Sequence, residues 1–403
     1  MSILSGKKIL LGITAGIAAY KTASLVRLFI KSGAQVKVIM TPAAKDFITP
    51  LTLSTLSKNP VHSSFVNEDD ENAVWNNHVD LGLWADLFLI APATANTLSK
   101  MANGTSDNLL LATYLSAKCP VYFVPAMDLD MHKHESTSNS FDKLQSFGNI
   151  MIPAASGELA SGLVGEGRMA EPEDIVAFIE KDILEQLPLN GKKYLITAGP
   201  TYEAIDPVRF IGNHSSGKMG FEIAGKAADL GAEVILVTGP THQTISHSHV
   251  TIIPTVSAED MYQVCHEHFK DCQVAILSAA VSDYRPKQVS SKKIKKAEST
   301  LSLELEKTKD ILASLGEIKN QQVLVGFALE TNDEIENAKG KLKKKNLDLI
   351  VLNSLKDEGA GFGVSTNKVT IINKNGNINE YELKSKADVA KDLLNEIMTY
   401  DNA

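Results

Sequence analysis

The sequence contains few cysteines, few aromatic residues and no long apolar run. Its three cysteines, Cys119, Cys265 and Cys272, are too few and too irregularly spaced for a disulfide framework. No apolar run approaches the roughly 20 residues that a membrane-spanning helix needs. The first residues lead directly into a strand pattern without a cleavable apolar segment. We therefore expect a cytoplasmic protein that does not contact a membrane.

A strong charge of either sign is also missing. The formal net charge is -8 over 403 residues, which argues against a general nucleic-acid-binding surface. Apolar residues make up 44% of the chain and charged residues 22%, as in globular proteins with sizeable cores. Lysines nevertheless gather at 287–296 and 339–345, so local basic pockets are expected. The length favours two or three domains.

The first forty residues predict a parallel strand–helix–strand unit. Apolar strands at 8–12 and 36–40 enclose a helix at 17–31. The connection GITAGI at 12–17 combines glycines, a hydroxyl group and a helix N-terminus, which are the features of a phosphate-binding loop. It is not the dinucleotide pattern GxGxxG, and Thr41 ends the second strand where that pattern requires an acidic residue. A mononucleotide therefore fits better than NAD.

Later strands end in polar loops of the kind that binds ligands. The apolar run 87–91 is followed by PATANT, and the run 121–124 is followed by PAMD. Open α/β sheets bind ligands at the C-terminal ends of their strands, so both loops are candidates for one site. The pattern begins again at 194–198, where a buried strand precedes a polar loop far longer than the usual connection of about 2–6 residues. A helix follows this loop, which therefore suits a phosphorylated substrate.

The second half predicts another mostly parallel sheet. Further strands alternate with helices at 233–237, 275–278, 323–328 and 347–352. The runs 368–373 and 378–383, joined by KNGN, predict an antiparallel hairpin at the sheet edge. The two halves meet near 186–191, where proline, asparagine and glycine interrupt the patterns.

Motifs in both halves resemble known enzymes. The first half carries GITAGIAAYK, His78 ahead of LGLWAD, APATANT, PAMDLDM and SGELASGLVGEGRMAEP, and it resembles the flavin-dependent cysteine decarboxylases. The second half carries AGPTYEAIDPVRFIGNHSSGKMG, SAAVSDYR, KKIKK, VGFALET and KLKKKNLD, and it is similar to phosphopantothenate–cysteine ligases. The whole chain therefore resembles the bifunctional phosphopantothenoylcysteine decarboxylases and phosphopantothenate–cysteine ligases of coenzyme A synthesis.

This resemblance implies an α/β fold class with two Rossmann-like domains and mostly parallel sheets. Residues 1–187 are expected to form a flavodoxin-like, FMN-dependent decarboxylase domain, and residues 188–403 a CTP-dependent ligase domain with the edge hairpin. The implied substrates are small molecules, namely 4'-phosphopantothenate, cysteine and CTP, with magnesium as a second cofactor whose ligands are undefined. The implied assembly is a homo-oligomer with trimeric decarboxylase contacts and dimeric ligase contacts.

In the first half, the resemblance assigns FMN binding to residues of the three strand-end loops. They are Gly12, Thr14, Gly16, Ile17, Thr41, Ala93, Thr94 and Met127. FMN is expected to oxidise the cysteinyl thiol so that the carboxylate leaves, and later to return hydride. His78 is the candidate acid/base because an imidazole titrates near neutral pH. Arg168 is expected to bind a substrate phosphate or carboxylate with its planar fork of donors.

In the second half, the resemblance implies that CTP activates the phosphopantothenate carboxylate as an acyl-cytidylate, which the cysteine amine attacks. The catalytic candidates are Asn213, which steadies the acyl-cytidylate, and Lys293. Arg209 is expected to bind the substrate carboxylate or phosphate, and magnesium to neutralise the triphosphate. The other substrate-binding candidates are Ser278, Ala279, Asp283, Asp310, Ile311, Phe327, Lys341 and Lys345.

Two residues depart from the decarboxylase pattern. Asp128 stands where the family has asparagine, and Ser161 where its flap has a proton-donating cysteine. A carboxylate about 4 Å from the substrate carboxylate costs roughly 4 kcal/mol at an effective dielectric of 20. Asp128 must then be protonated, paired or turned toward His78 or His132, and a serine hydroxyl is a weaker acid than a thiol.

We expect complete decarboxylation, with Asp128 favoured over Ser161 as the catalytic acid. Two alternatives stay open for this half. It could stop at the enethiol, or it could be a non-catalytic flavin-binding partner module.

Overall fold

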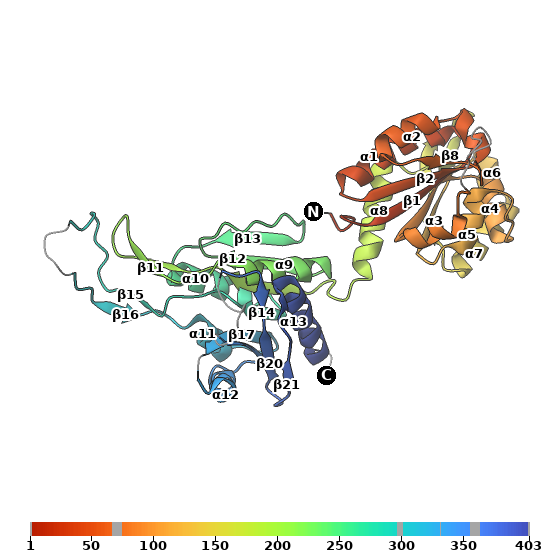
Figure 1. Cartoon of the computed structure of the whole chain (residues 1–403). Helices are drawn as coiled ribbons and strands as arrows, with labels where there is room; N and C mark the ends of the chain where they lie inside the picture. The colour runs from red at the N-terminus through yellow and green to blue at the C-terminus, as the bar shows by residue number, and fades with distance from the viewer. Residues whose placement is uncertain (1, 67–74, 296–300, 331, 355–362, 402–403) are drawn as a thin grey trace. The chain divides into compact units, whose positions relative to one another are not determined.

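The computed structural model describes residues 2–66, 75–295, 301–330, 332–354 and 363–401. The chain divides into two compact units, Met1–Leu184 (unit 1) and Glu185–Ala403 (unit 2), each with its own sheet (Figure 1). The sequence placed the join between Leu187 and Pro188, whereas the contacts divide the chain within helix α8 (Pro172–Glu185).

The sheet of unit 1 has six strands, all parallel to their neighbours, in the order β3-β2-β1-β4-β5-β6. Their bounds are β1 (Lys8–Ile13), β2 (Gln35–Met40), β3 (Val61–His62), β4 (Leu87–Ala93), β5 (Val121–Pro125) and β6 (Ile150–Met151). Without the two-residue edge strand β3, this order is the flavodoxin type. The order reverses between β1 and β4, which is where such sheets bind ligands.

Helices cover both faces of this sheet, because successive residues of a buried strand point to opposite sides. On one face, α1 and α8 pack Phe29 and Ile175 against Ile9 of β1. On the other face, α4 and α5 pack Leu98 and Leu110 against β1 and β4. The helices are α1 (Thr22–Lys31), α2 (Pro50–Ser57), α3 (His78–Trp84), α4 (Ala95–Ala102), α5 (Leu109–Ser116), α6 (Leu129–Lys133), α7 (Glu135–Ser146) and α8. The flap motif forms an antiparallel hairpin of β7 (Ala155–Glu158) and β8 (Val164–Arg168).

The sheet of unit 2 has eight strands in the order β13-β12-β9-β14-β17-β18-β20-β21. Their bounds are β9 (Lys193–Ala198), β12 (Glu233–Thr238), β13 (Val250–Pro254), β14 (Val274–Leu277), β17 (Val323–Glu330), β18 (Leu349–Ser354), β20 (Val369–Asn373) and β21 (Ile378–Glu380). Pairing is parallel from β13 to β18 and antiparallel for β20 and β21. The predicted α/β class and edge hairpin are therefore confirmed.

Five helices surround this sheet in the described residues. They are α9 (Lys218–Asp229), α10 (Ala258–Phe269), α11 (Ile311–Ile318), α12 (Glu334–Lys344) and α13 (Lys386–Asp401). Helices α9 and α13 bury Ile223 and Leu393 on one face, and α10, α11 and α12 bury Met261, Leu315 and Leu342 on the other. No helix in the described part of the chain is long and apolar enough to cross a membrane.

Unit 2 also has short two-stranded arms that the sequence did not predict. One pairs β10 (Tyr202–Ala204) with β11 (Phe210–Gly212), and another pairs β15 (Tyr284–Pro286) with β16 (Leu305–Lys307). Strands β10 and β15 contact each other, and Figure 1 shows both arms at the same end of unit 2. A further short pair joins β19 (Thr366–Asn367) to β22 (Lys384–Ser385).

Candidate functional site

Unit 1 has a cavity of about 970 Å³ where the loops after β1, β2, β4 and β5 leave the sheet, next to the flap. It lies at the strand ends where the sequence placed the flavin. The predicted residues that line it are Gly16, Ile17, Thr41, Thr94, Met127, Asp128, Ser161 and Arg168.

Three other predicted flavin residues are not among the described residues that line this cavity. Gly12 lies within buried β1, where an added Cβ would come 3.0 Å from Phe88. The Thr14 hydroxyl donates to the Pro92 carbonyl at 2.7 Å and is buried. Ala93 is the buried end of β4. These three residues are buried beneath the loops, and they present no accessible surface to a ligand in this cavity.

His78 is also not among the residues that line the cavity in the described chain. It is the first residue of α3, after the N-cap Asn77, and its ring lies edge-on to Phe65 with centroids 6.1 Å apart. Its Nδ1 is buried and makes no hydrogen bond within the described part of the chain. The structure therefore does not bring His78 together with Asp128 and Ser161 in this pocket.

Two features of the cavity wall fit the phosphorylated flavin that the resemblance implies. The Thr41 Oγ1 atom is buried and has no hydrogen-bond partner among the described residues, an arrangement that a ligand would satisfy. Gly16 has extended backbone, and an added Cβ would meet Thr94 Cγ2 at an ordinary 3.5 Å. The protein itself therefore does not require glycine here, whereas a close ligand would.

The two departures from the decarboxylase pattern contact each other. Ser161 Oγ, in the turn of the β7–β8 flap, donates to Asp128 Oδ1 at 2.8 Å. The same oxygen accepts the backbone N–H of Leu129 at 2.8 Å and so caps α6. Of the partners that the sequence suggested for Asp128, the structure shows neither His78 nor His132. Its hydrogen-bonded side-chain partner is Ser161.

Arg168 is held by a neighbouring carboxylate. Its Nη2 lies 2.6 Å from Glu171 Oε1, which also accepts from Lys21 Nζ at 2.9 Å. Lys21 is buried, lines the cavity and also donates to the Met169 carbonyl. The hydrogen bond from Lys21, assisted by Arg168, holds the pKa of Glu171 below its usual value. Glu171 thus accepts hydrogen bonds both from Lys21, which lines the cavity, and from Arg168, at the end of the flap strand β8.

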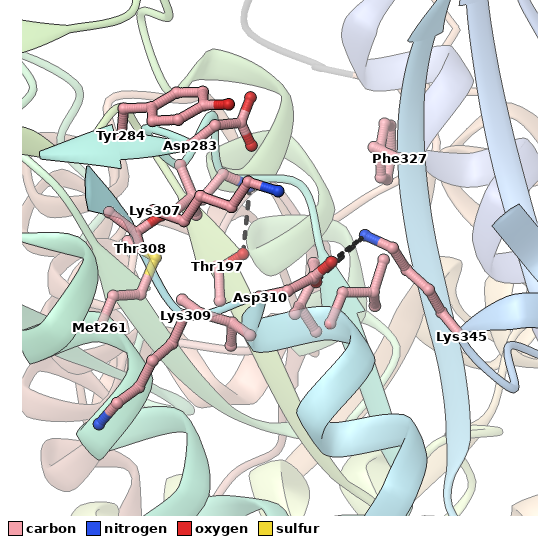
Figure 2. A pocket seen from close by; sticks show the side chains of 15 residues that line it. Thr197, Met261, Asp283, Tyr284, Lys307, Thr308, Lys309, Asp310, Phe327 and Lys345 are labelled. Carbon is pink, nitrogen blue, oxygen red and sulfur yellow. Dashed lines mark hydrogen bonds and ion pairs between the residues drawn. The ribbon is translucent and has the colours of Figure 1, made fainter. Parts of the chain in front are cut away.

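Unit 2 has a cavity of about 500 Å³ beside the ends of β14 and β17 (Figure 2). Six predicted nucleotide residues line it, namely Ala279, Asp283, Asp310, Ile311, Phe327 and Lys345. Lys345 Nζ lies 2.8 Å from Asp310 Oδ2, and Asp310 caps α11 by accepting from Ala313 N–H at 3.0 Å. Burial favours a higher pKa for Asp310, but the Lys345 and Ala313 hydrogen bonds lower its pKa overall.

The remaining ligase candidates lie beside this cavity or away from it. Asn213 Nδ2 donates to the Ala280 and Val281 carbonyls at 3.0 and 3.2 Å, next to the wall. Ser278 Oγ donates to the Thr197 carbonyl at 2.6 Å. Lys341 pairs with Glu330 at 2.6 Å. Arg209 and Lys293 are not among the residues that line the cavity, and Lys296 of the KKIKK segment lies outside the described residues.

Several lining residues were not predicted. Lys21 and Lys100 face the unit 1 cavity, and Tyr284, Lys307 and Thr308 face the unit 2 cavity. Lys21 had a signal, since it ends the quoted motif GITAGIAAYK. Tyr284 also had one, since it lies in the quoted motif SAAVSDYR. Lys307 and Thr308 belong to β16 and the loop after it, which carry no periodic pattern. Lys309 lines the same cavity, but its amine extends away in Figure 2 and pairs with Glu259 at 2.7 Å.

Comparisons with known proteins cover both units. A family model described as "DNA/pantothenate metabolism flavoprotein C-terminal domain" matches residues 189–400, and one described as "Flavoprotein" matches residues 2–184. Two solved structures are similar in sequence to part of the chain. The C-terminal domain of a coenzyme A biosynthesis bifunctional protein CoaBC is 45% identical, covering 53% of this chain and 97% of that one, with a TM-score of 0.46. A DNA/pantothenate metabolism flavoprotein from Streptococcus pneumoniae is 28% identical, covering 52% and 100%, with a TM-score of 0.47.

Three full-length relatives extend the similarity. A protein named "Cysteine/Cysteine sulfinic acid decarboxylase", from an unknown prokaryotic organism, is 56% identical over 87% of this chain and 99% of its own length. Coenzyme A biosynthesis bifunctional protein CoaBC of Escherichia coli is 40% identical over 99% of this chain and 98% of its own length. That of Bacillus subtilis is 44% identical over 98% and 97%. The chain belongs to the family of coenzyme A biosynthesis bifunctional proteins.

Proposed function

We propose that the chain catalyses two successive steps of coenzyme A synthesis. Unit 2 joins cysteine to 4'-phosphopantothenate with CTP and Mg²⁺, and unit 1 uses FMN to decarboxylate the resulting phosphopantothenoylcysteine to 4'-phosphopantetheine. The observation that carries this proposal is the similarity over 98% of the chain to a bifunctional protein of that pathway. A cavity in each unit, lined by some of the residues assigned to each reaction, supports it.

In unit 2, the side chains compensate the charge of two anionic substrates. The phosphopantothenate carboxylate attacks the α-phosphorus of CTP and releases pyrophosphate, and the cysteine amine then displaces CMP. Lys345 reaches the nucleotide phosphates by exchanging Asp310 for a phosphate oxygen, and Lys293 approaches from its exposed segment. Phe327 packs against the nucleotide, and Mg²⁺ neutralises the triphosphate.

In unit 1, FMN when bound supplies the thiol oxidation and the later reduction. Gly16, Thr41, Thr94 and Met127 would hold it. Arg168 orients a substrate anion at the flap, where Glu171 fixes its guanidinium.

The last chemical step needs a proton on carbon. Ser161 Oγ and Asp128 Oδ1 lie 2.8 Å apart, close enough for a proton relay. In this relay a protonated Asp128 donates to the Ser161 oxygen, the reverse of the hydrogen bond in the structure, while the Ser161 hydroxyl gives its own proton to carbon. A thiol at position 161 would not need that partner, because its own pKa is far lower than that of a hydroxyl.

The test is to incubate the purified protein with 4'-phosphopantothenate, cysteine, CTP and Mg²⁺, and to follow CMP release and product mass. We expect CMP and the saturated thiol from wild type. Under anaerobic conditions, Asp128→Asn and Ser161→Ala should accumulate the enethiol, which is two hydrogens lighter, and Ser161→Cys should restore the saturated product. Accumulation of the enethiol by wild type would contradict complete decarboxylation, and absence of both CMP and carbon dioxide would leave only a binding role.

A second candidate for unit 1 is the decarboxylation of free cysteine or cysteine sulfinic acid. The 56% identical relative carries that name, and Asp128 favours such a substrate. Free cysteine has an α-ammonium group, which the amide of phosphopantothenoylcysteine lacks. A carboxylate about 4 Å from an ammonium gains roughly 4 kcal/mol at an effective dielectric of 20, the same amount that it loses beside a carboxylate.

The two candidates differ in their kcat/KM values. We expect wild type to prefer phosphopantothenoylcysteine over cysteine and cysteine sulfinic acid when all three are supplied to the FMN-loaded enzyme. The second candidate instead requires a preference for the free amino acids, which Asp128→Asn would lower by about tenfold or more.

The assembly and location are proposals as well. We propose a cytoplasmic homo-oligomer with trimeric contacts between copies of unit 1 and dimeric contacts between copies of unit 2. Light scattering on the full chain would measure its molar mass in solution and so the number of copies in the oligomer. A monomer at micromolar concentration would contradict it.

A further inference from the structure

Asp206 is a carboxylate buried in the loop between β10 and β11 of unit 2. Its side chain has 0% exposure. One oxygen, Oδ1, accepts the backbone N–H groups of Val208 and Arg209, both at 2.9 Å. The other oxygen, Oδ2, accepts Arg209 Nε at 3.0 Å and also Arg209 Nη2. These donors, with the Arg209 side-chain hydrogen bonds first among them, outweigh the effect of burial and hold the pKa of Asp206 far below its usual value, so the group is ionised at neutral pH.

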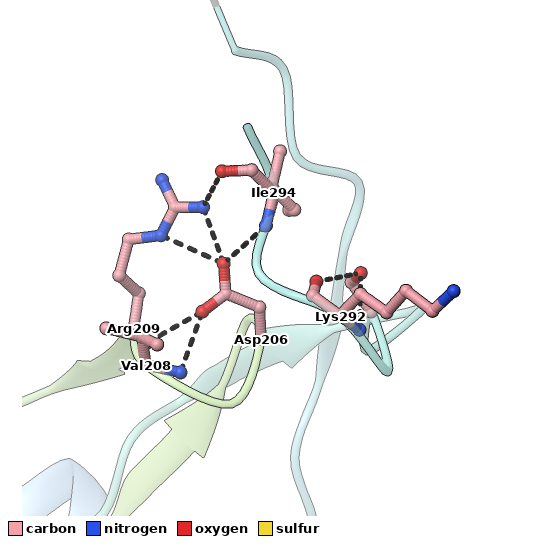
Figure 3. A network of polar contacts seen from close by, with 6 residues as sticks. Asp206, Val208, Arg209, Lys292 and Ile294 are labelled. Carbon is pink, nitrogen blue, oxygen red and sulfur yellow. Dashed lines mark hydrogen bonds and ion pairs between the residues drawn. The ribbon is translucent and has the colours of Figure 1, made fainter. Parts of the chain in front are cut away.

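Asp206 and Arg209 also form hydrogen bonds with a part of the chain that is distant in sequence. Asp206 Oδ2 also accepts the backbone N–H of Ile294 at 3.1 Å, and Arg209 Nη2 donates to the Ile294 carbonyl at 2.9 Å. Figure 3 shows the Asp206 carboxylate between the Arg209 fork and the Ile294 backbone. The Ser290 N–H adds a hydrogen bond to the Ile205 carbonyl at 3.0 Å. Both backbone polar groups of Ile294 are therefore fixed by two side chains of the β10–β11 loop.

Ile294 directly follows Lys293, the exposed lysine assigned to the ligase reaction. Fixing both peptide groups of one residue restricts the path of its neighbour's backbone, because only two soft dihedrals separate them. The Lys293 side chain keeps its freedom to reach a phosphate while its Cα stays in place. Arg209 Nε and Nη2 are engaged by Asp206 and Ile294.

We propose that Asp206 and Arg209 are positioning residues that act through Ile294 to hold Lys293 in reach of the ligase substrates. This role rests on the proposed ligase function. The segment 290–295, which we call the strap, depends on the pair because a guanidinium and a carboxylate together supply one donor and one acceptor to the Ile294 peptide.

The chain offers a variant that releases the strap and a matched control. In Asp206→Asn, the amide oxygen can still accept from Val208 and Arg209 N–H, but its NH₂ group faces the donors of Arg209 and Ile294. Glu304→Gln makes the same chemical change in the neighbouring arm, at an exposed carboxylate that pairs with Lys287 at 2.6 Å. Arg209→Lys is a third variant, since an ammonium keeps the charge but lacks the planar fork.

Two measurements on the full chain test the role. The first is the rate of tryptic cleavage after Lys292, Lys293 and Lys295, read by mass spectrometry. The second is the kcat and KM for CMP release. In Asp206→Asn and Arg209→Lys we expect strap cleavage to rise about tenfold and kcat to fall about 10²-fold, with the KM for cysteine changed less than about twofold. Glu304→Gln should change each quantity by less than about twofold.

Three results would overturn the role. Strap cleavage unchanged in Asp206→Asn would show that the pair does not hold the strap. Faster cleavage with unchanged kcat would show that the strap's position does not matter for ligation. A wild type that releases no CMP would remove the proposed ligase function and this role with it, and the cleavage assay distinguishes that result because the strap would still be released in the variant.

Discussion

Each unit contains an arginine bound to a carboxylate three residues away in sequence, but the two pairs differ in surroundings. In unit 1, Arg168 and Glu171 have 44% and 42% of their side chains exposed. In unit 2, Arg209 is 39% exposed and Asp206 is 0% exposed. Water solvates the first pair and weakens it, whereas the second carboxylate depends on its protein donors. Equal spacing in sequence therefore does not distinguish an exposed arginine–carboxylate pair from one whose carboxylate is buried.

The two units also differ in the burial of their cysteine thiols. Burial raises the pKa of Cys265 and of Cys272 to about 12, both in unit 2. Because the thiolate is the reactive form, each is expected to react slowly at pH 8, where its thiolate fraction is about a thousandfold smaller than that of a thiol at its ordinary pKa. Cys119 in unit 1 is only partly buried. We expect iodoacetamide to label Cys119 in native protein and the other two only on unfolding, as mapped by mass spectrometry. Equal native labelling of all three would contradict this.

Separate chemistry in the two units predicts separate losses. Lys293→Gln should lower CMP release by about 10²–10³-fold, because it removes a cation that stabilises developing phosphate charge. Decarboxylation of supplied phosphopantothenoylcysteine should stay within about twofold of wild type. Both rates are measured on the same preparation. Parallel loss of both activities would show that the sites are not separable.

The unit 1 cavity can be closed to the flavin without disturbing unit 2. Gly16→Leu places a side chain where the backbone faces the cavity, and we expect FMN affinity to fall by about 10–100-fold and the yellow colour to be lost. Gly16→Ala is the smaller step: its Cβ meets Thr94 at an ordinary distance, so the fold tolerates it, and the loss of FMN affinity should be smaller than in Gly16→Leu. FMN titration by absorbance and fluorescence measures both. Full FMN affinity in Gly16→Leu would show that the FMN phosphate does not bind beside Gly16.

The smallest effect is expected from the exposed pair itself. Glu171→Gln leaves Arg168 and Lys21 without a carboxylate, but Lys21 keeps the Met169 carbonyl. The Arg168–Glu171 pair is exposed, and exposed ion pairs contribute about 0–1 kcal/mol, so the decarboxylation kcat/KM should fall less than about fivefold. Steady-state kinetics and thermal unfolding check this. A loss as large as that expected for Asp206→Asn in ligation would remove the contrast between the two pairs.

The sequence predicted the sheets well because buried parallel strands are short apolar runs with distinct ends. The runs at 8–12 and 194–198 appear as β1 and β9, and the hairpin appears as β20 and β21. The arms and the flap hairpin were not predicted. Their strands are short and carry no alternating pattern, and they are defined by pairing with distant residues rather than by local preference.

Thr41 and Thr94, which follow predicted strands, line the unit 1 cavity, and Asp310, which the resemblance assigned, lines the unit 2 cavity. The sequence did not predict which lysine and arginine side chains are paired with a carboxylate from another helix, strand or loop. The sequence gives no sign that Glu330 pairs with Lys341 or that Glu171 joins Lys21 to Arg168, because these contacts depend on tertiary folding. Burial of Asp206 is likewise invisible in a polar loop, since aspartate is usually exposed there.

The hydrogen bond between Ser161 and Asp128 also constrains how this sequence can diverge from its relatives. Its two ends are the two positions at which the chain departs from the decarboxylase pattern. An ancestor that changed only one of them would have set a thiol beside a carboxylate or a hydroxyl beside an amide. We therefore expect substitutions at the two positions to have non-additive effects on decarboxylation, because the residues are in contact.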